Sequence, residues 1–352
     1  MTTDREAREA LTAFALPPSA AECVRVPGGH INATWRAGPW LLQRINPLVF
    51  PDGAAVMENV LAVTRRLAER PGSAATHLQL RRTRDGRWWH VAEDGAVWRV
   101  FAYIEGRTFD TAASPDLAEG AARAFGEFAS SMGEPPLHLH TTLPGFHDTR
   151  RRVDALADTA TRDPAGRARD VRRELDTILG ERALAAIIPD FLATGDLPLR
   201  VAHNDAKIAN VVFAPGSGAP LAVIDLDTTM PGSPLHDFGD LVRSMVSEAA
   251  EDAFDPASVR VRHVFFEAIV RGYLAGTGNL LSARERELLV TAARSIVLEQ
   301  AARFLADHLD GDLYYPATSP GVNLVRARSQ LALLADLTRE ADRLEGVVLR
   351  YL

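Results

Sequence analysis

The sequence predicts an α+β protein in two lobes, and three observations support this prediction. Short alternating runs separated by Gly and Pro turns fill roughly the first hundred residues, which is typical of an antiparallel sheet. Longer runs with apolar residues three and four apart fill most of the remainder, which indicates helices. At 352 residues the chain is long enough for two such units. We therefore expect a lobe of sheet plus helix over residues 1–102 and a mainly helical lobe over residues 103–352.

The first lobe is expected to hold two helices and several short strands. The helices are expected over residues 5–15 and 54–69, where apolar residues share one helical face. Alternation predicts strands at residues 22–26, 33–36, 40–45, 78–80, 88–92 and 97–106, with 78–80 and 88–92 paired as a hairpin.

The second lobe is expected to be built from long helices. The first begins at Ser114-Pro115, an N-cap residue followed by Pro at the first helical position. The others are expected at residues 148–160, 167–194, 259–275, 282–309 and 322–349.

Composition excludes several classes of function. A net charge of −7 and a pI near 5.8 argue against binding to nucleic acid. The single cysteine, Cys23, excludes an internal disulfide and a cysteine-based zinc site, which fits a reducing cytoplasm. The charged first ten residues lack the apolar run of a signal peptide, and no apolar run has membrane-spanning length.

One polar segment lies between two apolar runs, and it carries the chemistry. It reads His203-Asn204-Asp205-Ala206-Lys207-Ile208-Ala209-Asn210, between Val201 and Val211. The spacing His-x-Asp-x-x-x-x-Asn is that of a kinase catalytic loop, in which the Asp is the base and the Asn a metal ligand. The alternative is a strand–turn–strand with a solvated acidic turn.

A second carboxylate is expected after another buried strand, because Mg²⁺ needs hard oxygen ligands. Asp225 meets this expectation, since it ends the apolar run 221–224. Asp237-Phe238-Gly239 spells the metal motif of protein kinases, but it follows Pro231-Gly232-Ser233-Pro234 and not a strand. We therefore predict that Asn210 and Asp225 bind the metal and that Asp237 is structural.

Lys207 is the only lysine in the chain, although arginine is abundant. It can be a chance survivor of a composition that favours arginine. The functional alternative is that a compact ammonium is required two residues after the base, where it would neutralise the transferring phosphoryl group. We predict a catalytic role for Asp205 and Lys207 together.

The expected strands of the first lobe resemble the nucleotide lobe of a kinase. Gly28 and Gly29 form the first turn and would lay backbone N–H groups over the ATP phosphates, although such a pair is often only a turn. No lysine is present on the third strand, so Arg44 is the first candidate to replace it and Gln43 the second. Glu58 is either the ion-pair partner of Arg44 or a surface glutamate near a helix N-terminus.

The apolar strand that ends in Glu105-Gly106 marks the expected hinge between the lobes. Adenine would bind backbone groups at Ala102, Tyr103 and Ile104; the alternative is a core strand. Three histidines, His138, His140 and His147, fall in a loop-rich segment where they could bind a metal or be solvated.

The motifs together resemble the aminoglycoside phosphotransferase and small-molecule kinase superfamily, and within it the N-acetylhexosamine 1-kinase family. The catalytic loop and Ile224-Asp225-Leu226-Asp227 carry the first resemblance. The second is carried over residues 22–340 by stretches such as Gly29-His30-Ile31-Asn32-Ala33-Thr34, Phe146-His147-Asp148-Thr149, His236-Asp237-Phe238-Gly239-Asp240, Arg303-Phe304-Leu305-Ala306-Asp307 and Gly311-Asp312-Leu313-Tyr314-Tyr315.

The resemblance implies a bilobal protein-kinase-like fold and transfer of the ATP γ-phosphate, with Mg²⁺, to the anomeric hydroxyl of a hexosamine. It implies a monomer or homodimer that binds a sugar and ATP, but neither nucleic acid nor membrane. The implied substrate-facing residues are His30, His203, Asn204, Asp227, Arg303, Asp307, Tyr314 and Tyr315. Arg303 and Asp307 are either sugar ligands or an i, i+4 ion pair.

Two positions depart from the family pattern. Ala206 and Ala209 stand where the family usually has Thr and Asn. An unacetylated hexosamine or a plain hexose is therefore an alternative acceptor. A related kinase for an aminoglycoside, choline, homoserine or another sugar hydroxyl is the second hypothesis, and a catalytically idle kinase-like binding protein is the third.

Overall fold

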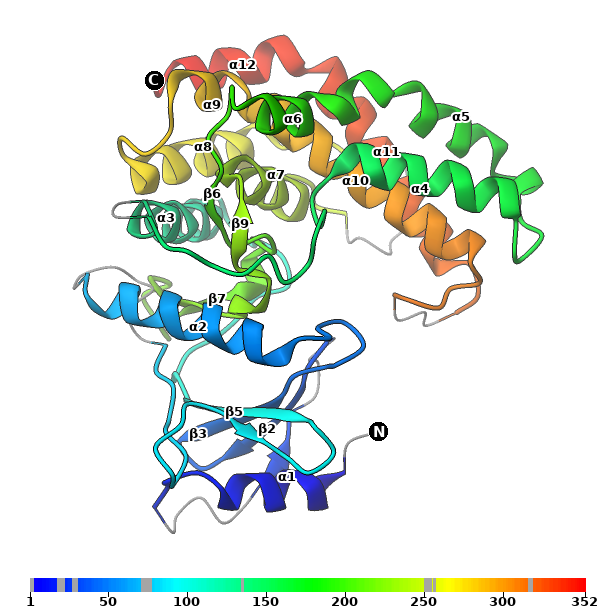
Figure 1. Cartoon of the computed structure of the whole chain (residues 1–352). Coiled ribbons are helices and arrows are strands. Elements are labelled where there is room, and N and C mark those ends of the chain that lie inside the picture. Colours follow the sequence, from blue (N-terminus) through cyan, green and yellow to red (C-terminus); the bar gives the residue numbers. More distant parts are fainter. Residues whose placement is uncertain are drawn as a thin grey trace.

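The computed structural model has the predicted α+β fold with two lobes (Figure 1). It describes residues 3–17, 23–26, 31–70, 78–133, 136–249, 255, 258–315 and 319–352. In Figure 1 the blue and cyan N-terminal lobe lies below the larger lobe, and α2 lies between the sheet and that larger lobe. No helix in the described ranges combines the length and apolar character needed to cross a membrane.

The N-terminal lobe is a five-stranded antiparallel sheet with the strand order β1-β2-β3-β5-β4. The strands are β1 (Val24–Arg25), β2 (Ala33–Ala37), β3 (Trp40–Arg44), β4 (His90–Val91) and β5 (Val97–Ala102), and the helices are α1 (Asp4–Thr12) and α2 (Gly53–Ala68). Side chains alternate between the sheet faces. Leu42 and Trp98 pack with α1, whereas Leu41 and Phe101 belong to the core shared with α2 and the second lobe.

The C-terminal lobe is mainly helical. Its α-helices are α3 (Pro115–Ser131), α4 (Thr149–Arg162), α5 (Arg172–Gly180), α6 (Arg182–Thr194), α7 (Pro234–Met245), α8 (His263–Thr277), α9 (Ala283–Glu287), α10 (Leu289–Leu309), α11 (Val322–Arg339) and α12 (Ala341–Leu349). Its strands are β6 (Arg200–Ala202), β7 (Val211–Phe213), β8 (Pro220–Val223) and β9 (Met230–Gly232), and its short 3₁₀ turns are η3 (Ala168–Val171), η4 (Ile208–Asn210) and η5 (Leu226–Thr228). β6 pairs with β9, and β7 pairs with β8.

Helix α10 is the centre of this lobe. Most of its side chains are buried around its whole circumference. A helix that is apolar on every side must be covered on every side, and α4, α6, α7 and α11 pack against it.

Several element predictions need correction. The predicted helices 167–194, 282–309 and 322–349 are each broken, at Glu181, Leu288 and Glu340 respectively, where ψ is near zero or slightly positive. Helix α7 was not predicted. The predicted hairpin is also wrong, because Leu80 and His90 both pair with β5 and not with each other.

Candidate active site

The candidate catalytic loop, residues 203–210, connects β6 to β7 and lies next to the turn that follows β8. The Ile224 N–H donates to the Asn210 carbonyl oxygen at 2.9 Å, which joins the two segments. Asp225 follows with φ = 62°, a left-handed conformation that a non-glycine residue adopts rarely. The structure therefore brings Asp205, Asn210 and Asp225 to one region, as the spacing predicted.

Asp205, Lys207 and Asn210 form a connected set. Lys207 Nζ lies 2.9 Å from Asp205 Oδ2. Asn210 Nδ2 donates to the same Oδ2 and to the Asp205 carbonyl oxygen, both at 2.8 Å. These contacts fix the Asp205 carboxylate in one orientation.

The charges of this set support one another. Burial would raise the pKa of Asp205, but the Lys207 ammonium and the Asn210 amide outweigh it and hold that pKa below its ordinary value. Burial would lower the pKa of Lys207, and the carboxylates of Asp205 and Asp225 raise it above its ordinary value. At neutral pH Asp205 is therefore an anion and Lys207 a cation.

Asp225 is exposed to solvent, yet many protein atoms surround its carboxylate. That surrounding protein raises its pKa to about 7, and the charges of Asp227 and Asp205 contribute to the same shift. Such a concentration of negative charge favours a bound cation.

The His203 ring is buried and bonded to the loop itself, which does not fit its predicted role as a substrate-facing residue. Its ring is buried between Phe125 and Phe128, with edge-to-face centroid distances of 5.1 and 5.5 Å. Nε2 lies 3.0 Å from the Ile224 carbonyl oxygen, and Nδ1 accepts the Asp205 N–H at 3.3 Å. Burial lowers the pKa of His203, so a neutral ring anchors the loop.

Asp237 has the structural position that we predicted. It is fully buried, and its carboxylate accepts the N–H groups of His203 at 2.9 Å and Asn204 at 2.7 Å. Asn204 has φ = 63°, and its side-chain amide donates to the carbonyl oxygens of Ala202 and Thr228. These contacts hold Asn204 as part of the loop framework, so the prediction that it grips substrate needs correction.

Asp227 is also engaged by protein groups, which does not fit its predicted role as a substrate ligand. It is ion-paired with Arg99 of β5, and both side chains are 2% exposed. Asn32 Nδ2 donates to the other carboxylate oxygen at 2.5 Å, and Arg99 Nε donates to Gln43 Oε1 at 3.0 Å. Sequence reasoning missed Arg99, although an arginine in the middle of an apolar strand was the available signal.

The predicted Arg44–Glu58 pair does not form. Arg44 lies on the α1 face of the sheet and pairs with Asp94 at 3.5 Å. Glu58 pairs with His140 at 2.6 Å, and both side chains are 55% exposed. Because adjacent strand residues point to opposite faces, Gln43 faces α2 and Arg44 faces away.

The hinge offers fewer backbone donors than predicted. The Ala102 N–H already donates to the Gln79 carbonyl oxygen at 2.9 Å, and the Tyr103 N–H donates to the Pro39 carbonyl oxygen at 2.8 Å. Ile104, the third residue of the predicted adenine site, follows these two in the chain. The predicted phosphate and substrate contacts Gly28, Gly29 and His30 lie outside the described residues.

Asp307 does not form the ion pair with Arg303, and protein groups occupy the carboxylate that was predicted to bind sugar. It accepts the N–H groups of Leu313, Tyr314 and Tyr315 at 2.7–3.0 Å and the Asn323 amide at 2.8 Å. This carboxylate fixes the turn after α10. The turn then determines where the two tyrosines lie.

Arg303 lies between two aromatic rings. Its guanidinium carbon is 5.4 Å from the Phe146 centroid and 5.5 Å from the Tyr315 centroid. Nη1 donates to Gln300 Oε1 at 3.1 Å, and no carboxylate among the described residues forms an ion pair with Arg303. Tyr314 is exposed and stacks edge-on against Tyr315 at 4.9 Å.

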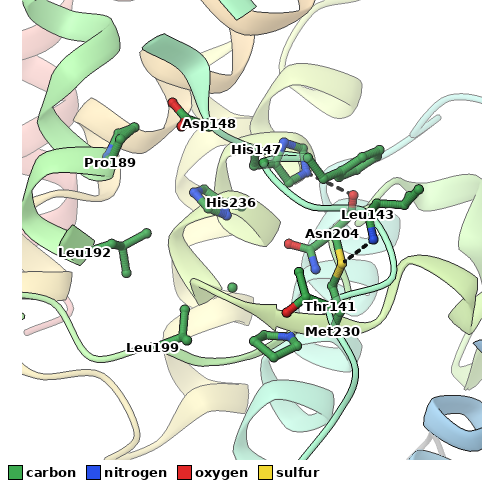
Figure 2. A pocket seen from close by; sticks show the side chains of 14 residues that line it. Thr141, Leu143, His147, Asp148, Pro189, Leu192, Leu199, Asn204, Met230 and His236 are labelled. Carbon is green, nitrogen blue, oxygen red and sulfur yellow. Dashed lines mark hydrogen bonds between the residues drawn. The ribbon is translucent and has the colours of Figure 1, made fainter. Parts of the chain in front are cut away.

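A cavity of about 210 Å³ opens beside the catalytic loop (Figure 2). Leu192 and Leu199 border it on one side in Figure 2, and Asn204 and Met230 on the other. His147 is one of its walls and is buried, so the alternatives of a metal-binding or solvated histidine are both wrong for this residue. His138 and His140 are exposed.

Comparison with solved structures identifies the fold. An aminoglycoside phosphotransferase from Alicyclobacillus acidocaldarius superimposes with a TM-score of 0.60 at 14% identity, covering 95% of this chain and 96% of that one. A choline/ethanolamine kinase family protein from Mesorhizobium loti gives 0.57 at 20% identity, with 98% and 99% covered. A spectinomycin phosphotransferase bound to ADP and spectinomycin gives 0.57 at 12% identity, with 99% and 98% covered.

The fold and the loop geometry define a two-lobed, aminoglycoside phosphotransferase-like kinase architecture. The sequence also matches the model of the phosphotransferase enzyme family over residues 22–276, well over half of its length. The chain belongs to this family, and it is a small-molecule phosphotransferase.

Proposed function

We propose that the protein is an ATP- and Mg²⁺-dependent sugar kinase that phosphorylates the anomeric hydroxyl of a hexosamine or related hexose. The observation that carries the proposal is the set Asp205–Lys207–Asn210 beside Asp225. Asp205 is the proposed base. Phosphoryl transfer has a loose transition state, in which the phosphoryl group moves before the acceptor has lost much of its proton. A carboxylate of low pKa, although a weak base, therefore suits this reaction.

Lys207 is the proposed electrostatic partner of the reaction. Its ammonium lies against Asp205 and feels the charge of Asp225. From that position it would stabilise the negative charge that passes between the donor and acceptor oxygens.

Asn210 and Asp225 are the proposed metal ligands, and their chemistry fits Mg²⁺. The Asn210 amide nitrogen is engaged by Asp205, so its oxygen is the atom left for a cation. No cluster of three His, Cys, Asp or Glu side chains that could hold a metal occurs in the described ranges. A site of one carboxylate and one amide suits Mg²⁺, which bridges nucleotide phosphates and keeps several waters.

For the nucleotide, the hinge at Ala102–Ile104 remains the proposed adenine site. The backbone carbonyl groups of the hinge and the backbone of Ile104 are the groups proposed to bind adenine. Arg44 is not proposed as a phosphate ligand, because its side chain lies on the face of the sheet that packs against α1, away from α2 and the larger lobe.

For the acceptor, Arg303 is the proposed ligand, with Tyr314 and Tyr315. Arg303 has aromatic rings on two sides and no acidic partner among the described residues. A guanidinium in this setting donates several hydrogen bonds in one plane, which suits the ring hydroxyls of a sugar.

The reaction product decides the acceptor position. The protein with Mg·ATP and a panel of hexosamines, N-acetylhexosamines and hexoses is expected to give one phosphorus signal coupled to the anomeric proton. A 1-O-methyl glycoside is expected to be inert. If that glycoside is phosphorylated as fast as the free sugar, transfer goes to another hydroxyl. If only an aminoglycoside, choline or homoserine reacts, the sugar assignment is wrong.

Two substitutions separate the proposed roles. Asp205→Asn is expected to lower turnover roughly 10²- to 10⁴-fold, the usual contribution of a positioned general base, with ATP binding nearly unchanged. Asp225→Ala is expected to weaken binding of Mg·ATP as well, measured by calorimetry. Asp94→Asn is the control, since Asp94 is an exposed carboxylate of the N-terminal lobe. Near-normal turnover of Asp205→Asn would disprove the base assignment.

A further inference from the structure

A histidine–glutamate pair outside the proposed site contacts the main chain of the catalytic loop. His147 precedes α4, and Glu299 lies on α10. Their side chains are 7% and 2% exposed, and His147 Nδ1 lies 2.8 Å from Glu299 Oε1. His147 Nε2 lies 3.0 Å from the carbonyl oxygen of Asn204, the residue before Asp205 (Figure 2).

The partners of His147 determine its protonation. A backbone carbonyl can only accept, so Nε2 carries a hydrogen. Nδ1 faces a carboxylate, and Glu299 accepts in addition from Thr149 Oγ1 at 3.0 Å. An imidazolium satisfies every group: it donates from Nδ1 to an ionised Glu299 and from Nε2 to the Asn204 carbonyl oxygen.

Buried charges are retained where they are paired, and this pair is well satisfied. Burial opposes both charges, but the two partners outweigh it: the pKa of His147 is raised above its ordinary value and that of Glu299 is lowered to about 2. The surrounding charged or titratable groups are Arg303 on α10, Arg152 on α4, His236, Asp237 and Asp240 on α7, Asp148 before α4 and Asp205 in the loop.

The pair joins the two halves of the proposed site. On one side His147 holds the main chain immediately before Asp205. On the other side Glu299 is one helical turn from Arg303, the proposed acceptor ligand, and its charge acts on Arg303. The distance between base and acceptor therefore depends on this contact.

We propose that His147, held by Glu299, is a positioning residue that fixes the Asn204–Asp205 main chain relative to the acceptor wall on α10. This proposal rests on the proposed kinase activity. It predicts that His147 and Glu299 affect turnover and not nucleotide binding. A displacement of about 1 Å at a reacting group can cost about 100-fold in rate.

The first test separates positioning from general stability. His147→Leu is expected to lower kcat roughly 10- to 100-fold while KM for ATP stays within about twofold. His147→Gln keeps one N–H donor and is expected to recover a large part of the loss. His140→Leu is the matched control, because His140 also pairs with a glutamate, Glu58, but at the surface. All variants are assayed at least ten degrees below their measured Tm.

The second measurement does not depend on turnover. A nitrogen-15 NMR titration of the imidazole is expected to show that His147 keeps both nitrogens protonated to a higher pH than an ordinary histidine does. In the isosteric Glu299→Gln variant one nitrogen is expected to lose its proton.

Each outcome counts for or against one proposal. If the wild-type protein phosphorylates no alcohol, the proposed function is wrong, and the NMR result alone decides the state of the pair. If the wild type is active and His147→Leu keeps full kcat, or loses Tm without losing kcat, His147 is not a positioning residue. A His147 ring that loses its proton at or below the ordinary histidine pKa also overturns the charged pair.

Discussion

Four of the buried carboxylates around the proposed site are held by different sets of partners. Glu299 faces a histidine, Asp227 an arginine, and Asp237 two backbone N–H groups of the catalytic loop. Asp307 accepts three backbone N–H groups and an amide. An unpaired buried carboxylate would be too costly to retain, so each of these acids fixes the segment that supplies its partner.

The Glu299 carboxylate gives a pH prediction. Its pKa is lowered to about 2 in the folded state from an ordinary 4.5. A depressed carboxyl pKa stabilises the fold above the unfolded pKa, and that contribution is lost as pH falls from about 4.5 towards 2. The Tm difference between wild type and Glu299→Gln is therefore expected to be larger at pH 6 than at pH 3. A difference that grows on acidification would contradict the assignment.

At the residue scale, the sequence predicted which residues of the catalytic loop lie together, but it did not predict the partners of Arg44 and Arg99. Asp205, Asn210 and Asp225 are close in the chain, and their spacing alone brings them together. Arg44 and Arg99 were distinguishable only with strand register, since Gln43 opposes Arg99 and a shift of one residue reverses the face. Residues such as His147 and Glu299, which are 152 apart, meet only through tertiary packing.

At the element scale, the helices α3 and α8 approach more closely than side chains normally permit. A Cβ on Gly272 would lie 2.3 Å from the Glu119 carbonyl oxygen, and one on Gly276 would lie 2.4 Å from the Arg123 carbonyl oxygen. These atoms belong to the backbone and cannot rotate away. The glycines therefore set the distance between the two helices.

This packing gives a stability prediction with a matched control. Gly272→Ala is expected to destabilise the protein by about 1–3 kcal/mol, because overpacking outweighs the gain of up to about 1 kcal/mol in helix propensity. Gly346→Ala on α12 meets no atom within 4 Å and is expected to stabilise by about 0.5–1 kcal/mol. Urea denaturation measures both. Equal effects of the two substitutions would mean that α3 and α8 separate without cost.

Helix existence was easier to predict than helix continuity. The apolar period runs unbroken through residues 322–349, yet the helix is broken at Glu340, and α11 packs mainly against α10 whereas α12 packs mainly against α8. Helix α7 was not predicted, although Ser233-Pro234 is an N-cap followed by Pro, the same start signal as Ser114-Pro115.

At the scale of the whole molecule, buried polar side chains fasten the lobes to each other at two places among the described residues, in addition to exposed pairs such as Glu58–His140. The first is Asp227, which follows the proposed metal ligand and binds Arg99 and Asn32 of the N-terminal lobe. The second is Asn59 on α2, whose amide donates to the carbonyl oxygens of His140 and Thr229 at 2.8 and 3.2 Å. Both contacts end in the segment 227–229, so the position of the N-terminal lobe is tied to the turn that carries Asp225.

The Arg99–Asp227 pair gives the prediction for the whole molecule. Arg99→Met leaves Asp227 buried without its cation, and breaking a buried pair on one side costs about 3–5 kcal/mol. Arg44→Met removes a partly exposed pair with Asp94 and is expected to cost less than about 1 kcal/mol. The double variant Arg99→Met/Asp227→Asn is expected to be more stable than Arg99→Met, because no charge is left unpaired.

Denaturant titration gives these free energies, and limited proteolysis gives their structural meaning. Because Arg99 and Asp227 belong to different lobes, loss of the pair is expected to expose the hinge after Ala102 to protease before the helical lobe unfolds. If Arg99→Met and Arg44→Met lose equal stability, the buried pair does not hold the lobes together. If stability falls without faster cleavage at the hinge, the pair stabilises the sheet only. The relative position of the lobes then depends on the contacts of Asn59.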